Sequence, residues 1–104
     1  MGLQALQKLK GGGGRIAVIG AGRMGLPIGY SAATGLWGRS PKGWGQLVYV
    51  DPFVDALASA TKRFNEGLLR GKEKDVAAAA DHVLFSPTYD AIDGADLVIA
   101  ATIE

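Results

Sequence analysis

The stretch RIAVIGAGRMG, residues 15–25, decides the fold of this chain. Its first half, Arg15–Gly20, is a short apolar run rich in β-branched residues, and such a run is typical of a buried parallel strand. Its second half has the spacing G-x-G-x-x-G and leads into a segment that we predict to be helical from Met24 to Ala33, with Gly35 just past its end. A glycine-rich turn between a strand and a helix favours a phosphate-bearing ligand, because the helix N-terminus offers free N–H groups and a positive dipole end.

Each glycine of this motif has its own physical role in the prediction. Gly20 permits the tight turn out of the strand, Gly22 lets the backbone approach a pyrophosphate, and Gly25 lets the helix pack against the strand. No Gly-Lys-Ser/Thr follows, which argues against a P-loop. A structural turn that binds nothing remains the alternative. The candidate cofactor-binding residues of this loop are Gly20, Ala21, Gly22, Arg23, Met24 and Gly25.

The rest of the chain alternates between apolar runs and helical patterns. We predict a loop over Leu36–Gln46, a strand over Leu47–Asp51, helices over Pro52–Asn65 and Lys74–Asp81, a strand over His82–Phe85, a turn or short helix over Tyr89–Gly94 and a strand over Asp96–Thr102. Strands that alternate with helices imply a parallel sheet. We therefore predict an α/β fold, a Rossmann-type doubly wound parallel sheet. We expect it to be truncated after the fourth strand, since no sequence remains to supply the next helix.

Asp51 is a further candidate binding residue, at the end of the second predicted strand. An acid there can accept hydrogen bonds from both hydroxyls of an adenine ribose, and its charge would repel the 2′-phosphate of NADP, so we predict NAD as the cofactor. Asp51 could instead cap the helix that follows Pro52. Arg39 and Lys42 could approach an NADP phosphate, which leaves NADP open.

The predicted loop over Leu36–Gln46 lengthens the connection to Asp51 beyond the usual spacing of about 20 residues. We interpret it as a surface insertion, which has a small thermodynamic cost. Its two tryptophans, Trp37 and Trp44, either cover the edge of the sheet or form a surface for a partner.

Composition narrows the remaining function classes. The chain has 104 residues, which fits one small domain, and its net charge of +1 argues against nucleic acid or an anionic membrane as a partner. The absence of cysteine excludes disulfides and thiolate chemistry, and the one histidine, His82, cannot build a metal site alone, so we expect no metal. We interpret His82 as a solvated or helix-capping residue.

The two parts of the chain are a flexible N-terminal tail over residues 1–14, which contains Gly11–Gly14, and a partial NAD-binding domain over residues 15–104. The sequence has no apolar run long enough to cross a bilayer and no secretory signal pattern. We therefore expect a cytoplasmic protein.

From Arg15 onward the sequence resembles 3-hydroxyacyl-CoA dehydrogenases. The most telling stretch is ADLVIAATIE over residues 95–104, which follows VLFSP over residues 83–87 and resembles the family's Ala-Asp-Leu-Val-hydrophobic-Glu-Ala-x-x-Glu. The other matching stretches are IAVIGAGRMG over residues 16–25, Val50-Asp51, and FNEGLLRGK over residues 64–72.

The resemblance implies an NAD-dependent oxidoreductase that oxidises a secondary alcohol in fatty acid metabolism. It also implies the strand order 3-2-1-4 and further cofactor contacts at the end of the fourth strand and just past it, at Ala101, Thr102 and Glu104. The family's catalytic histidine–glutamate pair would fall beyond Glu104, so we expect no catalytic residue in this chain. A small-molecule hydroxy substrate would be bound by residues outside the chain, and the full-length protein would be a homodimer.

A second resemblance, carried by Gly25-Leu-Pro-Ile-Gly29, is to nucleotide-sugar dehydrogenases of the UDP-glucose type and to β-hydroxyacid dehydrogenases. A non-catalytic nucleotide-binding module is the other alternative. Five cations could meet acidic groups of CoA, but we interpret them as a solvated helix face. They are Lys62, Arg63, Arg70, Lys72 and Lys74.

Overall fold

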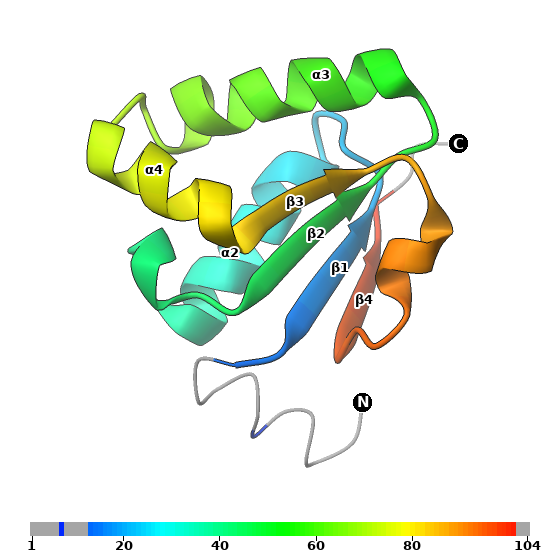
Figure 1. Cartoon of the computed structure of the whole chain (residues 1–104), viewed down its shortest axis with the longest axis horizontal. Helices are drawn as coiled ribbons and strands as arrows, with labels where there is room; N and C mark the ends of the chain where they lie inside the picture. Colours follow the sequence, from blue (N-terminus) through cyan, green and yellow to red (C-terminus); the bar gives the residue numbers. More distant parts are fainter. Residues whose placement is uncertain (1–6, 8–12, 102–104) are drawn as a thin grey trace.

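Four parallel strands form one sheet in the order β3-β2-β1-β4 (Figure 1). The computed structural model describes residue 7 and residues 13–101, so most of the predicted tail lies outside the described residues. The elements are β1 (Arg15–Ile19), α2 (Gly25–Trp37), the 3₁₀ turn η1 (Pro41–Gly43), β2 (Gln46–Val50), α3 (Val54–Arg63), the π-helical η2 (Phe64–Leu68), α4 (Glu73–His82), β3 (Val83–Ser86), the 3₁₀ turn η3 (Tyr89–Ile92) and β4 (Leu97–Ala100). The predicted Rossmann-type fold and strand order are confirmed.

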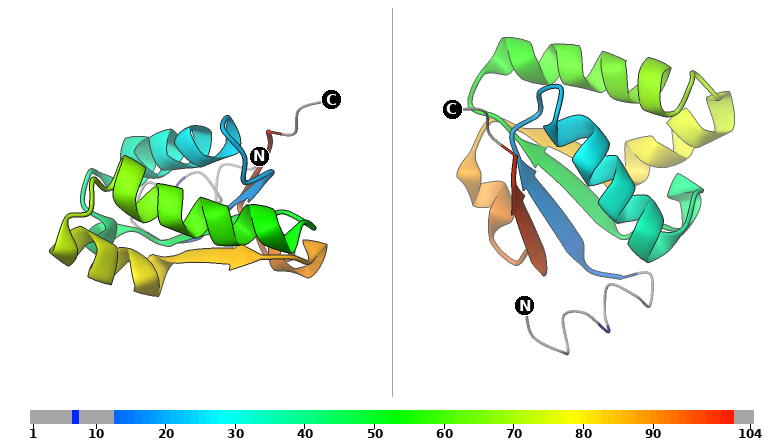
Figure 2. Two further views of the ribbon diagram at one scale, coloured as in Figure 1. Left: turned by 90° about the horizontal axis from the view of Figure 1, so that it is seen from above. Right: turned by 180° about the vertical axis from the view of Figure 1, so that it is seen from behind.

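Helices α2 and α3 lie on the same side of the sheet (Figure 2). The core beneath them is rich in aromatic side chains. Phe64 lies edge-on to the rings of Tyr30, Trp44, Tyr49 and Phe85, with centroids 5.9 to 6.4 Å apart. Edge-to-face rings attract one another in addition to burying apolar area. Phe64 therefore joins α3 and η2 to the sheet and to α2.

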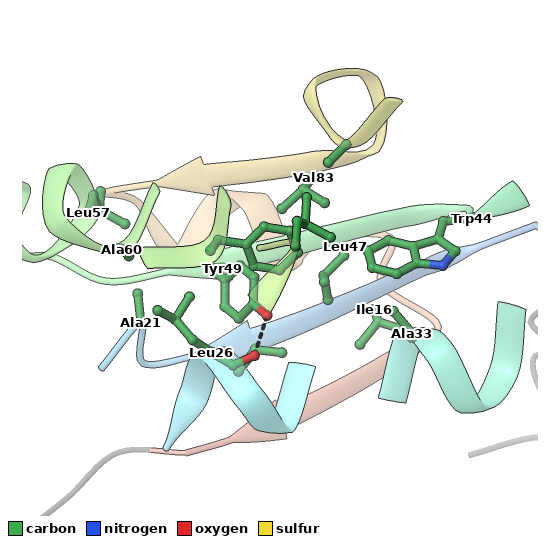
Figure 3. Close-up of a cluster of buried hydrophobic side chains, with 14 residues drawn as sticks. Ile16, Ala21, Leu26, Ala33, Trp44, Leu47, Tyr49, Leu57, Ala60 and Val83 are labelled. Atoms are coloured by element: carbon green, nitrogen blue, oxygen red, sulfur yellow. Dashed lines mark hydrogen bonds between the residues drawn. The ribbon is translucent and has the colours of Figure 1, made fainter. Parts of the chain in front are cut away.

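Tyr49, at the centre of this core, connects β2 to α2 through its hydroxyl, which donates a hydrogen bond of 2.7 Å to the carbonyl of Leu26 (Figure 3). The helix approaches closely here because residue 29 is glycine: a Cβ at Gly29 would meet the Tyr49 hydroxyl. The start of α2 is thus fixed against the sheet by one polar contact inside an apolar core.

The opposite face of the sheet carries no α-helix within the described part of the chain. The turn η3 packs near β2. It is tied to β1 by Arg15, whose guanidinium donates to the carbonyls of Ala91 at 3.3 Å and Asp93 at 3.0 Å. Leu84 and Val98, whose neighbours in the sequence face the core, stay 43% and 46% exposed on this face. The sheet therefore has one closed face and one partly open face.

Helix α2 is longer than the sequence predicts. It continues through Gly35 to Trp37, and the residue that ends it is Gly38, with a φ of 100°. Gly35 has open space around it and keeps a helical conformation. The prediction that the helix ends near Gly35 was wrong, because glycine permits a left-handed ending without enforcing one.

The predicted loop over Leu36–Gln46 was wrong at both ends and in its middle. Its first residues belong to α2, its last residue begins β2, and Pro41–Gly43 form η1. Trp44 is buried and donates from its indole nitrogen to the carbonyl of Gly38, and Trp37 donates to the carbonyl of Gly13. Trp44 therefore packs in the core beside Tyr30 and Phe64, a place that neither of the two roles considered for it describes.

The starts of α3 and β3 also differ from the prediction, and each difference has a physical cause. Pro52 does not open α3, which begins at Val54, because an oxygen of Asp51 accepts the N–H of Phe53 and holds these residues in a turn. His82 does not begin β3 but ends α4, where its Nδ1 lies 3.2 Å from the carbonyl oxygen of Gly45. The other predicted ends differ by one or two residues, apart from the continuation of α3 into η2.

Candidate functional site

The glycine-rich loop lies at the carboxyl ends of the strands, where β1 turns into α2 (Figure 1). Gly20 leaves β1 with a φ of 108°, which side chains with a Cβ rarely adopt, and its N–H donates to the carbonyl of Val50 at 2.7 Å. Gly25 is buried, and a Cβ there would overlap the carbonyl of Gly20. These two glycines let the chain turn sharply and begin a helix directly against the strand end.

The middle of the loop is open. A Cβ at Gly22 would meet no atom within 4 Å, and Gly22, Arg23 and Met24 are all exposed. The N–H of Leu26 donates to the carbonyl of Gly22, so the three N–H groups between them precede the first helical bond and have no helical acceptor. Such groups can donate to an anion.

Asp51 joins this loop to the end of β2. Its Oδ2 accepts the N–H of Ala21 at 3.2 Å, and its Oδ1 accepts the N–H of Phe53 at 3.0 Å. The N-cap residue of α3 is Phe53, which has no side-chain cap. The alternative in which Asp51 caps that helix is therefore wrong. Each carboxylate oxygen keeps a further lone pair that can accept from a ligand hydroxyl.

A hollow of about 360 Å³ lies between the loop, Asp51 and the end of β4. Three large apolar side chains line it and are mostly exposed: Met24 at 54%, Phe53 at 72% and Tyr89 at 53%. Apolar walls beside a few convergent polar groups are typical of a small-molecule site. The combination suits a ligand with a flat ring, hydroxyls and an anionic group.

The residues predicted after β4 are placed only in part. Ala101 lines the hollow, and its N–H donates to the carbonyl of Ile19 at 2.8 Å, which sets the end of β4 beside the end of β1. Thr102 and Glu104 lie outside the described residues.

The structure does not bring the two loop cations, Arg39 and Lys42, to this hollow. Arg39 lines a different hollow beside Arg70 and Lys72, and Lys42 lies in η1, which packs against α4. Within the described part of the chain, no three histidine or acidic side chains are grouped so that they could hold a metal ion.

Three residues of the site were not predicted. Phe53 and Tyr89 line the hollow, and Arg63 donates to the carbonyl of Ala21 at 3.0 Å. Arg63 is exposed, as its interpretation as part of a solvated face expects, but its guanidinium also reaches the loop. A sequence signal existed for Arg63 alone: it lies three residues after Ala60 and next to Phe64, at the edge of the apolar face of its helix, although the residue itself is exposed.

Comparison with known proteins supports the predicted resemblance through structure and not through sequence. No family model and no curated protein matches the sequence. The structure is similar to the crystal structure of 3-hydroxybutyryl-CoA dehydrogenase from Escherichia coli, with a TM-score of 0.63 and 26% identity. The match covers 88% of this chain and 19% of that chain, so this chain spans about a fifth of the enzyme's length. The chain thus has a dehydrogenase-like fold.

The described part of the chain contains no helix with the length and apolar character needed to traverse a membrane.

Proposed function

We propose that this chain is the NAD-binding part of an oxidoreductase that oxidises a secondary alcohol, of the 3-hydroxyacyl-CoA dehydrogenase type. One observation carries the proposal: Asp51 is hydrogen-bonded to a glycine-rich loop that leaves open space at Gly22. The similarity to the Escherichia coli enzyme supports it. When bound, NAD supplies the hydride-accepting ring, and the protein supplies binding and orientation.

The residues present fit the parts of this cofactor. The N–H groups at the start of α2 would hold the diphosphate, and the free lone pairs of Asp51 would accept the ribose hydroxyls. Phe53 and Tyr89, which line the hollow, offer apolar surface for the adenine. Ala101, which lines the hollow, would then lie toward the nicotinamide half, and Thr102 and Glu104 stay predicted cofactor contacts.

The same site favours NAD over NADP. The carboxylate of Asp51 would repel a 2′-phosphate on the ribose. The cations that could have offset this repulsion, Arg39 and Lys42, do not line the hollow. The groups that bind the hydroxy substrate and move its proton would come from a part of the protein beyond this sequence.

A calorimetric titration of the chain with NADH, and separately with NADPH, tests the proposal. We expect saturable binding of NADH at least about tenfold tighter than that of NADPH. Gly22→Ala should weaken NADH binding by at least about tenfold, because its methyl group would occupy the space that a diphosphate needs. The melting temperature should hardly change, because the methyl group meets no atom of the protein.

Gly35→Ala is the matched control, since Gly35 is also surrounded by open space but lies far along α2. It should bind NADH as the wild type does. NADH affinity that survives Gly22→Ala, or a folded wild-type chain without NADH affinity, would contradict the proposed function.

A further inference from the structure

Ala21, between the first two glycines of the loop, is held from both sides. It is fully buried; its N–H donates to Asp51, and its carbonyl accepts a hydrogen bond of 3.0 Å from Nη2 of Arg63. Arg63 ends α3, and Figures 1 and 2 show α3 running beside the loop between β1 and α2. A hydrogen bond from a guanidinium is stronger than one between neutral groups. The loop is therefore clamped between β2 and α3.

The position of Arg63 is set by its neighbour Phe64. Phe64 is fully buried and contacts four other rings, so it cannot rotate without opening the core. The helix changes from α to π at this residue, where the N–H of Leu69 donates to the carbonyl of Phe64. Single π-helical turns are rare and often lie at functional sites. The core thus decides the direction in which Arg63 leaves its helix.

The peptide bond between Ala21 and Gly22 transmits this constraint to the loop. In a planar trans peptide the C=O and the N–H point in opposite directions, and the described residues contain no cis peptide. By fixing the carbonyl of Ala21, Arg63 also fixes the N–H of Gly22, which points away from it. The positive charge on the carbonyl further polarises the peptide and makes this N–H a better donor.

We infer that Arg63 is a positioning residue for the glycine-rich loop. This inference rests on the function proposed above. Its guanidinium sets the plane of the Ala21–Gly22 peptide and thereby aims the N–H groups that follow at the diphosphate of the ligand. Arg63 acts through Ala21 and not by touching the ligand. Its loss should therefore affect the phosphate-bearing part of the ligand far more than the adenosine part, which would lie beside Asp51 and Phe53.

NMR titration of the full chain with two probes tests this role. ADP-ribose carries the diphosphate, and adenosine does not. In Arg63→Met we expect the Kd for ADP-ribose to rise at least about tenfold and the Kd for adenosine to change less than about twofold. The amide resonance of Gly22 should shift in the free variant, because the hydrogen bond on the preceding carbonyl is gone.

Lys62→Met is the matched control: it removes the same charge one residue earlier, from a side chain that is exposed like Arg63 but, within the described residues, makes no hydrogen bond to the loop. It should change both Kd values less than about twofold, consistent with the weakness of exposed charges at a distance in salt. If Lys62→Met lost as much ADP-ribose affinity as Arg63→Met, the loss of positive charge alone would explain the effect, and the positioning role would be overturned. Equal weakening of both probes in Arg63→Met, or unchanged ADP-ribose binding, would also overturn it.

Arg63→Gln keeps the test decisive if Arg63→Met does not fold. The glutamine side chain is polar but too short to reach Ala21, so it should show the same selective loss, and wild-type binding of ADP-ribose would overturn the role. A wild-type chain that binds neither NADH nor ADP-ribose would refute the proposed function itself. Normal wild-type binding with no selective loss would refute only the role of Arg63.

Discussion

Tyr49 and Asp51 are separated by one residue in the sequence, yet they lie in regions of opposite character. The ring of Tyr49 is fully buried and stacked on Phe85 with centroids 5.4 Å apart, and its hydroxyl is bonded to Leu26. Asp51 lies at the rim of the same sheet, beside the mostly exposed Phe53. Both the ring and the hydroxyl of Tyr49 are thus engaged in contacts within the protein. At the rim, the fold leaves apolar surface and hydrogen-bonding capacity unused, so the rim is the region available to a ligand.

The largest expected effect is that of Gly25→Ala, which would push the start of α2 away from the end of β1. The added methyl group would overlap the carbonyl of Gly20, a backbone atom that cannot turn away. We expect a loss of stability beyond the about 1–3 kcal/mol of ordinary overpacking, enough to unfold a small domain. Circular dichroism during thermal unfolding measures it. Gly22→Ala, three residues earlier, should fold normally. A stable Gly25→Ala protein would show that the helix does not need this close approach.

The next largest effect separates two phenylalanines. Phe64→Ala should lower the free energy of unfolding by about 3–5 kcal/mol, because it leaves a cavity among four rings. Phe53→Ala should stay within about 0.5 kcal/mol of the wild type, because the side chain is 72% exposed. Urea denaturation of both variants gives the comparison, and NADH titration of Phe53→Ala should show weakened binding. Similar losses of stability in the two variants would mean that the rim is part of the core.

The features that the sequence predicts correctly are those that short stretches determine. The apolar run before Gly20 and the glycine spacing up to Gly25 specify a strand, a turn and a helix without reference to the rest of the chain. The position of Asp51 at the end of the next strand places it beside that turn, because parallel strands end at the same edge of a sheet. Most of the fold and the central part of the candidate site follow from these residues.

The features that the sequence does not predict depend on contacts between distant segments. Gly35 and Gly38 both suit a helix ending, and the packing of Trp37 and Trp44 on each other decides between them. Arg63 resembles the other cations of its segment until the rotation of its helix, fixed by Phe64, is known. No short-range pattern contains such information, so the clamp on Ala21 is visible only in the folded chain.

The smallest expected effect comes from one hydroxyl in the closed region. Tyr49→Phe keeps the ring and its stacking on Phe85 but removes the hydrogen bond to Leu26. We expect a loss of about 1 kcal/mol in the free energy of unfolding at neutral pH, the usual worth of a buried hydrogen bond. Urea denaturation at pH 7 measures the difference. A larger loss would indicate that the hydroxyl also fixes the start of α2, and in that case NADH binding should weaken as well.

At high pH we expect Tyr49→Phe to become more stable than the wild type. Burial raises the pKa of Tyr49, because the phenolate would lose its hydration in the apolar core. The unfolded chain releases this proton near pH 10, whereas the folded chain retains it. Above that pH the folded state binds more protons, so the wild type should lose up to about 1.4 kcal/mol per pH unit relative to Tyr49→Phe. The two curves of stability against pH should therefore run parallel below about pH 9 and cross near pH 11. Other titrating groups are common to both proteins and cancel in the difference. Curves that stay parallel throughout would show that water reaches Tyr49, and the contrast between a closed core and an open rim would then be lost.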